Sequence, residues 1–319
     1  MESVLLVKTS SLGDVIHNLP VVSDIHRVWG EATVDWVVEE SFAPIARLHA
    51  GVTGIIPVAI RRWRKTLARR ATWREISGFV QCLRRKHYGA VIDAQGLLKS
   101  ALITAAARGI RYGLDWSSSR EPLRPFYDCT IKVPWTHHAV ERNRMLAARA
   151  LGYQASSAPS YGIQASAAAF SWLPRRPYFV FLHASSATEK LWPEAAWLQL
   201  GTQLGKEGFS CLLPWGDAVE HSRSLRLAAQ SAGAVVPPAL TLDELAGVLA
   251  SARGCAGVDT GLTHLAAALG VPTVGIYGAT DPAATGLYAC PRAVSLGRMG
   301  QFPMVDEVRA GLQQLVNGK

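Results

Sequence analysis

Short apolar runs alternate with amphipathic stretches along the whole sequence, and this alternation limits the folds open to the chain more than any other feature. The apolar runs have the length and composition of buried strands and cover Val4–Val7, Thr33–Val38, Ala90–Asp93, Tyr178–His183, Ser210–Pro214 and Thr273–Tyr277. Helical stretches lie between them and include Trp73–Lys86, Ala139–Leu151, Glu194–Glu207, Glu220–Ala232 and Thr241–Arg253. The last of these begins with a capping-box pattern formed by Thr241 and Glu244. Strands that alternate with helices form parallel sheets with helices on both faces, so the predicted fold class is α/β.

A linker is predicted at Ala155–Pro177, because its serines and its prolines Pro174 and Pro177 disfavour a helix. The length of 319 residues is itself typical of two domains. We therefore expect two similar domains, residues 1–165 and 177–303, that face each other across a cleft. The amphipathic segment 304–319 is expected to form a C-terminal helix that crosses back to brace the first domain.

Positive charge is concentrated in the first half of the chain. Residues 1–160 carry 22 basic and 13 acidic side chains, whereas residues 161–319 carry 11 of each. Residues 61–86 alone hold ten basic residues and one acid, Glu75, which is too few for pairing along a helix to offset the repulsion. A charge run is most often a solvated helix face, but this one predicts an anionic partner. Lipid headgroups or nucleic acid both qualify, and Trp63 and Trp73 suit a membrane interface as well as a core.

The five cysteines are scattered without a CxxC pair, which is typical of a reducing compartment and argues against a disulfide framework or a structural zinc site. The first apolar run is too short for the core of a signal peptide, and no stretch of 18 apolar residues follows. We expect a soluble, cytoplasmic protein.

The first motif that could carry chemistry is Lys8–His17, directly after the first predicted strand. It contains a single glycine, so it matches neither a GxGxxG dinucleotide loop nor a Walker loop. Gly13 permits a tight turn, and the next helix is expected to begin near Pro20. Asp14 then has two possible roles. It either caps this segment, which spacing alone favours, or acts as a general base at the mouth of the cleft.

Two motifs in the second half follow predicted strands. Hydroxyl groups and Lys190 in His183–Pro193 form a possible phosphate cradle. In Gly257–Gly270, Asp259 ends a strand, and Thr260 and Gly261 open a helix whose free N–H groups should hold a diphosphate. His264 lies on the same helix face as Thr260 and is a possible phosphate donor, although a lone helical histidine is more often structural. Glu220 alone is more typical of a first-turn helix acid than of a ligand.

Taken together, these segments resemble the lipopolysaccharide heptosyltransferases, over nearly the whole chain and in register. The basic block and Arg120-Glu121-Pro122-Leu123 favour the type I branch over type II. The other matching segments are Lys8–Val15, Asp35–Glu40, Ile56–Lys65, Val91–Ser100, His138–Arg142, Phe181–Lys190, Pro214–Gly216 and Val258–Leu265. The resemblance implies a GT-B glycosyltransferase with two Rossmann-like domains. It also implies inverting transfer of heptose from ADP-L-glycero-β-D-manno-heptose, bound by the second domain, to the inner Kdo of Kdo2-lipid A, bound by the first. No metal or other cofactor is implied.

The resemblance also implies roles for individual residues. It matches the family's base to Asp14 and its pyrophosphate-binding lysine to Lys190. The implied donor pocket comprises Ser185, Ser186, Lys190, Glu220, Asp259, Thr260, Gly261 and His264. The acceptor side is expected to comprise Ser10, Gly13, Arg61, Arg62, Arg64, Lys65 and Arg120. Two departures from the family are serines at 185 and 186, where threonines are common, and a short C-terminus.

The basic first half is then expected to face an anionic membrane, with the protein peripheral on the inner face of the inner membrane. A nucleic-acid-binding protein is the alternative from a different class, but no helix-turn-helix, RRM or KH signature is visible, and no nucleic-acid partner is expected. An NAD-linked enzyme is disfavoured because the glycine fingerprint is missing.

Overall fold

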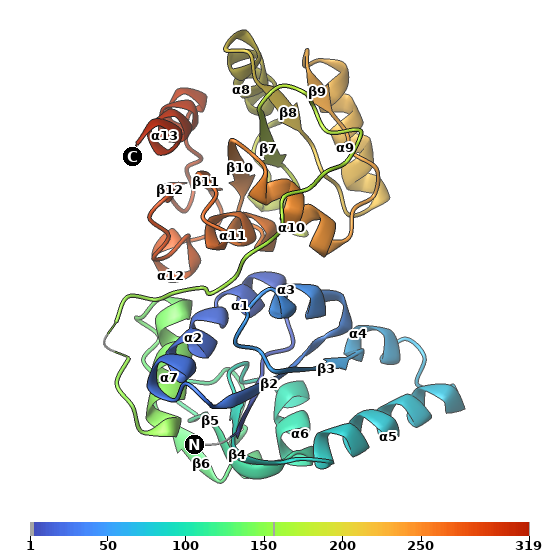
Figure 1. Cartoon of the computed structure of the whole chain (residues 1–319), viewed down its shortest axis with the longest axis vertical. Coiled ribbons are helices and arrows are strands. Elements are labelled where there is room, and N and C mark those ends of the chain that lie inside the picture. Colours follow the sequence, from blue (N-terminus) through green and yellow to red (C-terminus); the bar gives the residue numbers. More distant parts are fainter. Residues whose placement is uncertain (1–2, 156, 319) are drawn as a thin grey trace. The chain divides into compact units, whose positions relative to one another are not determined.

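The computed structural model describes residues 3–155 and 157–318, and it divides into two units, Met1–Ile163 and Gln164–Lys319. The division lies inside Ala155–Pro177, the segment with linker composition. Each unit contains one six-stranded sheet in which all paired strands run parallel (Figure 1). The prediction of an α/β fold with two parallel sheets is therefore confirmed.

The first unit has the strand order β3-β2-β1-β4-β5-β6. Its strands are rich in apolar residues at the centre, where Leu6 on β1 aligns with Trp36 on β2 and with Ile92 on β4. The strands are β1 (Ser3–Val7), β2 (Thr33–Glu39), β3 (Gly54–Val58), β4 (His87–Asp93), β5 (Arg108–Leu114) and β6 (Cys129–Ile131). The helices are α1 (Leu12–Ile16), α2 (Leu19–Val28), η1 (Glu40–Phe42), α3 (Ala43–Arg47), α4 (Ile60–Trp63), α5 (Arg70–Arg84), α6 (Leu98–Ala106), η2 (Arg124–Phe126) and α7 (Ala139–Leu151).

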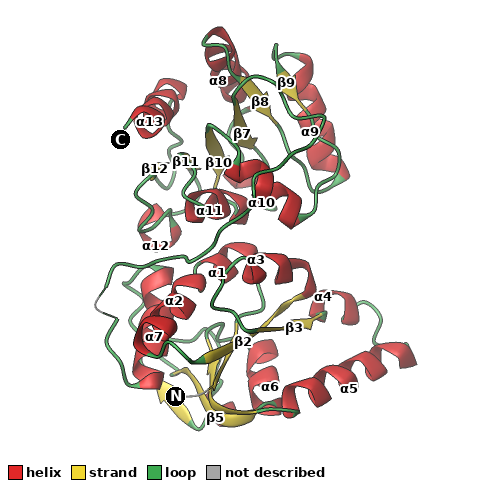
Figure 2. Cartoon of the chain, in the orientation of Figure 1, coloured by secondary structure: helices red, strands yellow, loops and turns green. Residues whose placement is uncertain are grey.

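Helices cover both faces of this sheet, with α2 and α7 on one side and α5 and α6 on the other (Figure 2). Leu5 and Val7 of β1 pack in one core cluster with Leu83 of α5 and Ile103 of α6. Because neighbouring side chains on a strand point to opposite faces, the alternate residues Val4 and Leu6 are buried on the other face. A strand covered on both faces is apolar along its whole length, which explains the uninterrupted run at the N-terminus.

The second unit repeats this organisation with the order β12-β11-β10-β7-β8-β9. The strands are β7 (Tyr178–Leu182), β8 (Ser210–Leu212), β9 (Ala234–Val235), β10 (Gly254–Val258), β11 (Thr273–Tyr277) and β12 (Ala293–Gly297). The helices are η3 (Thr188–Lys190), α8 (Glu194–Lys206), α9 (Ala218–Ala229), α10 (Leu242–Ala250), α11 (Gly261–Ala268), α12 (Pro282–Thr285) and α13 (Val305–Asn317). The predicted capping box of α10 is present, with Thr241 and Glu244 bonded to each other.

The strand order creates a switch point in each unit. The second and third strands of each unit lie on one side of its first strand, and the fourth to sixth strands lie on the other side, so β1 lies beside β4 and β7 lies beside β10. The chain leaves the two strands of such a pair in opposite directions, which opens a crevice at their carboxyl ends where ligands bind. Two candidate ligand-binding regions follow from this topology. One is formed by Lys8–Asp14 and Ala94–Leu97 in the first unit, and the other by Ser185–Lys190 and Asp259–Gly261 in the second unit.

Helix α13 buries its apolar stripe of Val305, Val308 and Leu312 in the core of the second unit, against α8 and strands β10–β12. Gly13 lies inside the short helix α1, and the helix expected near Pro20 begins at Leu19. No helix among the described residues is long and apolar enough to cross a membrane.

Candidate active site

At the switch point of the first unit, the loops after β1 and β4 are joined by buried hydrogen bonds. The Lys8 ammonium is buried and donates to the carbonyl of Ala94 at 2.7 Å. The Gln95 side-chain oxygen accepts from both the N–H and the hydroxyl of Thr9, each at 2.7 Å, and its nitrogen donates to the hydroxyl of Ser10 at 3.3 Å. These contacts hold the two loops in one arrangement at the carboxyl edge of the sheet.

Asp93, the last residue of β4, determines the shape of the second loop. Its Oδ1 accepts hydrogen bonds from the N–H groups of Gln95 and Gly96 at 2.9 and 3.0 Å, and its Oδ2 accepts from the Tyr127 hydroxyl at 2.8 Å. Gly96 has a φ of 68°, a conformation that glycine adopts without strain. Asp93 is fully buried, and burial raises the pKa of its carboxyl group. It is therefore a structural anchor for the loop that carries Gln95.

Asp14 has one oxygen committed to the helix and one directed to the site. Its Oδ2 accepts from the N–H and the hydroxyl of Ser11 at 2.9 and 2.8 Å, which closes the first turn of α1. Its Oδ1 lies 3.9 Å from the Lys8 ammonium, and the side chain remains 46% exposed. Both roles considered from the sequence are thus compatible, since capping uses only one of the two carboxylate oxygens.

The electrostatic surroundings of Asp14 favour its charged form. Partial burial acts to raise the pKa, but the Lys8 ammonium and the two hydrogen bonds from Ser11 outweigh it, and Arg120 adds to them. The pKa of Asp14 is therefore lowered below its ordinary value. At neutral pH the side chain is a carboxylate that can accept a proton through Oδ1.

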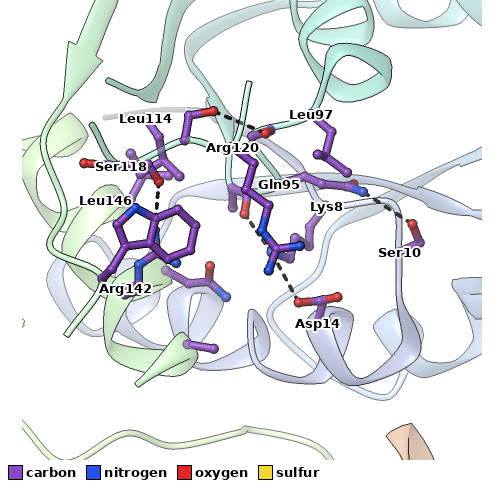
Figure 3. A pocket seen from close by; sticks show the side chains of 16 residues that line it. Lys8, Ser10, Asp14, Gln95, Leu97, Leu114, Ser118, Arg120, Arg142 and Leu146 are labelled. Atoms are coloured by element: carbon purple, nitrogen blue, oxygen red, sulfur yellow. Dashed lines mark hydrogen bonds and ion pairs between the residues drawn. The ribbon is translucent and has the colours of Figure 1, made fainter. Parts of the chain in front are cut away.

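Three cationic side chains converge on the pocket that contains Asp14 (Figure 3): Lys8, Arg120 and Arg142. Arg142 lies over the ring of Trp135, with Cζ 3.5 Å from the ring centroid, and Arg120 lies 6.0 Å from the same centroid. Burial, and then the charge of Arg120, lower the pKa of Arg142, and its Nε is buried without a hydrogen-bond partner among the described residues. Neither arginine forms an ion pair with a described carboxylate. A pocket with this excess of positive charge fits a carboxylate-bearing ligand.

The start of the basic block lies near this pocket but is partly neutralised. Arg62, expected from the sequence as an acceptor ligand, forms ion pairs with Glu40 at 3.1 Å and with Glu75 at 2.7 Å. The additional acid, Glu40, comes from η1 and is distant in sequence. The side chain of Arg61 lies over Phe42, with Cζ 4.9 Å from the ring centroid. Arg61, Arg64 and Lys65 are exposed and form no ion pair with any residue that the structure describes.

Lys99 connects the basic block to the pocket. Its ammonium donates to the Ser10 hydroxyl at 2.7 Å. Partial burial, together with the charges of Arg61 and Arg64, lowers the pKa of Lys99, while Glu39 and Asp14 oppose this shift. These interactions place Arg61 and Arg64 within electrostatic reach of the loop that carries Ser10 and precedes Gly13 and Asp14.

At the switch point of the second unit, Asp259 organises the groups that follow three strands. The ammonium of Lys190, from η3, lies 2.7 Å from Asp259 Oδ2, and the Thr280 hydroxyl donates to the same oxygen at 2.7 Å. His264 Nε2 lies 3.7 Å from Oδ1. Burial acts to raise the pKa of Asp259, but His264, Lys190 and Thr280 outweigh it and hold the pKa far below its usual range.

The N-terminus of α11 completes this second cluster. Thr260 is the N-cap and its side chain makes no capping bond, so the first N–H groups of the helix, beginning at Gly261, have no side-chain cap. The hydroxyl of Ser185 donates to the Asp259 carbonyl at 3.5 Å. A lysine, a histidine and uncapped helix N–H groups at one point form an anion site suited to a diphosphate.

Two of the predicted donor residues lie outside these contacts. Ser186 is exposed and makes no hydrogen bond to the Asp259 cluster among the described residues. Glu220 lies in the first turn of α9, where its Oε2 accepts from the Gly216 N–H at 2.7 Å and Asp217 caps the helix. Next to it, the ring of Trp215 lies 4.2 Å from that of His221 and donates to the Pro237 carbonyl. The other carboxylate oxygen of Glu220 accepts no hydrogen bond from a residue that the structure describes.

Sequence reasoning missed Lys8, Gln95, Lys99 and Arg142 as members of the first site, and Thr280 as a member of the second. Lys8 had a usable signal, because a lysine directly after a buried strand lies at the ligand-binding edge of the sheet. Arg142 and Thr280 had none, since only folding brings them to Trp135 and Asp259. Within residues 3–155 and 157–318, no group of three or more His, Cys, Asp or Glu side chains is placed to hold a metal ion.

The chain is similar to known glycosyltransferases. The model of glycosyltransferase family 9 (heptosyltransferase) matches residues 76–309. Lipopolysaccharide heptosyltransferase 1 of Pseudomonas aeruginosa is 50% identical over 291 residues, which cover 89% of this chain and 81% of the relative. The enzyme of the same name from Escherichia coli K12 is 46% identical over 290 residues, which cover 89% of this chain and 90% of the relative.

The fold agrees as well. The structure of E. coli heptosyltransferase WaaC with ADP is similar with a TM-score of 0.89 and 40% identity, covering 98% of this chain and 99% of that one. The alternative of a nucleic-acid-binding protein is not favoured by these relatives, and neither is the type II alternative. On the identity and coverage of its relatives, the chain belongs to glycosyltransferase family 9, the heptosyltransferases.

Proposed function

We propose that this protein is a type I lipopolysaccharide heptosyltransferase that moves L-glycero-D-manno-heptose from ADP-heptose to the inner Kdo of Kdo2-lipid A. The observation that carries the proposal is the position of Asp14 Oδ1, which accepts no hydrogen bond from a described residue, in a pocket with Arg120 and Arg142, which have no carboxylate partner among the described residues. A Kdo residue carries the two groups that this pocket is suited to bind. It brings a carboxylate for the arginines and a hydroxyl group whose proton Asp14 can accept.

The acceptor hydroxyl attacks the anomeric carbon of the donor from the face opposite to ADP. Its proton passes to Asp14 Oδ1, and a new glycosidic bond forms as the bond from the anomeric carbon to the ADP oxygen breaks. The β-linked donor then gives an α-linked product. The ammonium of Lys8, 3.9 Å from Oδ1, keeps Asp14 ionised before the reaction, so the base is ready at neutral pH.

The groups around Asp259 are suited to the leaving ADP. The diphosphate gains negative charge as the bond breaks, and Lys190, His264 and the N–H of Gly261 can stabilise that charge in the transition state. Asp259 orients Lys190 through the 2.7 Å ion pair and so reduces the ordering required when the donor binds. Ser185 and Thr260 supply hydroxyl groups at the same helix start, and Ser186 and Glu220 are assigned to the outer parts of the donor.

The basic side chains Arg61, Arg64 and Lys65 are assigned to the anionic acceptor, together with Ser10, Gly13 and Arg120. Kdo2-lipid A carries phosphates and carboxylates and lies in a membrane, so the enzyme is proposed to work as a peripheral protein on the inner face of the inner membrane. Each exposed basic residue near an anionic bilayer contributes about 1 kcal/mol to such binding.

A direct assay tests this function. The protein is incubated with ADP-heptose and deacylated Kdo2-lipid A, and the products are analysed by mass spectrometry. A gain of one heptose on this acceptor, and none on an acceptor that already carries the first heptose, is expected. Transfer only to the heptosylated acceptor would assign the protein to the type II activity. Absence of transfer to either acceptor would refute the proposal.

A further inference from the structure

The end of α5 that follows α4 presents a small surface in which apolar and basic side chains are mixed. We call this surface the α5 tip and define it as Leu67, Arg69, Arg70, Trp73 and Arg74. The first turn of α5 lies at the end of the helix away from the sheet of the first unit (Figure 1). Leu67 is 49% exposed and Trp73 is 58% exposed, and all three arginines are exposed.

The backbone of the α5 tip is held by its own hydrogen bonds. The Thr72 hydroxyl donates to the Thr66 carbonyl at 2.8 Å, and the N–H of Arg69 donates to the same carbonyl at 3.0 Å. The indole N–H of Trp73 donates to the Leu67 carbonyl at 2.8 Å. Because its one polar group is already bonded, the Trp73 ring can leave water without losing a hydrogen bond.

The charge of the tip is not offset within the protein. Arg69, Arg70 and Arg74 form no ion pair with any residue in the described part of the chain. Glu75, which adjoins them in sequence, is bound instead by Arg62 at 2.7 Å and by the indole of Trp63 at 2.8 Å. The basic block, residues 61–86, therefore contains two groups of arginines with different surroundings. Arg61 and Arg64 act on Lys99 near the pocket, whereas the tip carries unpaired arginines beside exposed apolar side chains.

We propose that the α5 tip is a membrane anchor that binds an anionic lipid bilayer. Trp73 and Leu67 enter the boundary between headgroups and acyl chains, and the three arginines bind lipid phosphates. The combination favours a bilayer over a nucleic acid, because a nucleic acid offers phosphates but no apolar layer for an exposed leucine. This inference rests on the proposed function in one respect: it gives the enzyme a way to reach an acceptor embedded in a membrane.

Vesicle co-sedimentation, with neither donor nor acceptor present, tests the anchor directly. The protein is mixed with vesicles of phosphatidylcholine alone or of phosphatidylcholine with phosphatidylglycerol. We compare the double variants Leu67→Ser/Trp73→Ser and Arg69→Gln/Arg70→Gln with wild type. Arg175→Gln/Arg176→Gln is the matched control, because it removes two exposed arginines from the second unit and changes the net charge equally.

Wild type is expected to bind the anionic vesicles. Removal of two arginines from the tip should weaken that binding about tenfold or more, and the control pair should change it less than twofold. The Leu67/Trp73 variant should lose the binding that persists at high salt, where charge is screened. Leu67→Ser alone and Trp73→Phe serve as further variants, since Leu67 makes no side-chain hydrogen bond and phenylalanine keeps the apolar ring. Leu67→Ser should weaken binding, and Trp73→Phe should retain most of it.

Equal vesicle binding by wild type and both tip variants would overturn the anchor. The anchor would also be overturned if the arginine substitutions weakened vesicle binding and the Leu67 and Trp73 substitutions did not. That pattern is typical of a polyanion site, such as one for nucleic acid. Heptose transfer provides a second measurement. With a water-soluble deacylated acceptor the tip variants should keep the kcat/KM of wild type, and with an acceptor in vesicles it should fall. The two proposals can fail separately. If the tip variants lose vesicle binding but the wild-type protein transfers no heptose to either acceptor, the proposed function is refuted and the anchor is supported.

Discussion

The two carboxylate oxygens of Asp14 have different partners: Oδ2 accepts hydrogen bonds from Ser11, and Oδ1 lies 3.9 Å from the ammonium of Lys8. The capping bonds fix the orientation of the side chain, and Lys8 keeps it charged. A base that must accept a proton at a defined position benefits from both effects, because neither its geometry nor its ionisation has to change when the acceptor binds.

Asp14→Asn should lower kcat by about 10²–10⁴, the usual effect of losing a general base, and leave the affinity for ADP-heptose nearly unchanged. Asparagine can still accept the hydrogen bonds from Ser11, so the helix cap survives and only the base is lost. Steady-state kinetics and donor titration measure the two quantities. Ser11→Ala is the matched control; it removes one capping bond and should cost about 1 kcal/mol of stability while turnover stays near wild type. Turnover of Asp14→Asn close to that of wild type would reduce Asp14 to a cap.

The pH profile should reflect the charge of Lys8. Since the pKa of Asp14 is lowered, the acid limb of kcat/KM should lie below the ordinary aspartate value of about 3.9. Removing the neighbouring positive charge raises that pKa, so Lys8→Met should move the acid limb to higher pH. Arg120→Gln should move it in the same direction by less, because Lys8 is the stronger of the two influences. An acid limb that stays in place in both variants would contradict this assignment.

Lys190→Ala should weaken binding of ADP by roughly tenfold to a hundredfold, because the diphosphate loses a charge-assisted contact. Asp259→Asn should also weaken it, since Lys190 loses the partner that orients it. Calorimetric titration with ADP measures both. Thr202→Ala is a control, because it removes an exposed hydroxyl of α8 that donates to the Leu198 carbonyl of the same helix, and it should change affinity little. ADP affinity and turnover should be insensitive to EDTA, and activity lost with EDTA and restored by Mg²⁺ or Mn²⁺ would contradict the predicted metal-free mechanism.

Arg61→Gln/Arg64→Gln should raise the KM for the Kdo acceptor and leave the KM for ADP-heptose unchanged. Rising salt should narrow the difference from wild type, because exposed charges are screened. Arg84→Gln/Arg85→Gln removes the same charge from the C-terminal end of α5 and serves as control. A fall in melting temperature with unchanged acceptor kinetics would mean that Arg61 and Arg64 have a structural role only.

Stability should fall between about pH 6.5 and pH 4 because of two buried histidines. Burial lowers the pKa of His49 in the first unit and of His183 in the second from 6.5 to about 4. Their contribution is complete above pH 6.5 and is lost as the pH falls toward 4, since the unfolded chain binds the protons first. Each contributes of order 1–3 kcal/mol. Urea unfolding at pH 7 and pH 5 should show a smaller pH effect in His49→Asn and in His183→Asn than in wild type, and an equal effect in all three proteins would contradict the prediction.

The sequence by itself determined the fold class and the central strands. β1, β2 and β4 are covered on both faces, so their apolar runs are continuous and visible without a structure. Sheet edges were not predictable in this way. The edge strand β6 has three residues, none of them buried, and the edge strand β9 has two residues, so neither carries a clear pattern.

The motifs after the strands were also visible in sequence, because parallel topology brings strand ends to one edge. Asp14, Lys190 and Asp259 were selected as candidates for that reason. What folding decided was which groups meet across large separations. Arg62 is neutralised by Glu40 and Glu75, and Lys190 is held by Asp259, 69 residues away.

The same holds for the division of the basic block and for the last helix. The charges of residues 61–86 can be counted from the sequence. The sequence does not reveal that Glu75 forms its ion pair with Arg62, so that this carboxylate does not offset the arginines of the α5 tip. The apolar stripe of α13 was predictable from the sequence, but the surface that it packs against was not. An apolar stripe indicates only that one face of a helix is buried. The tertiary structure chose the sheet of the second unit, where Val308 and Leu312 complete the core, because burial depends on which apolar surface is left uncovered when the rest of the chain has folded.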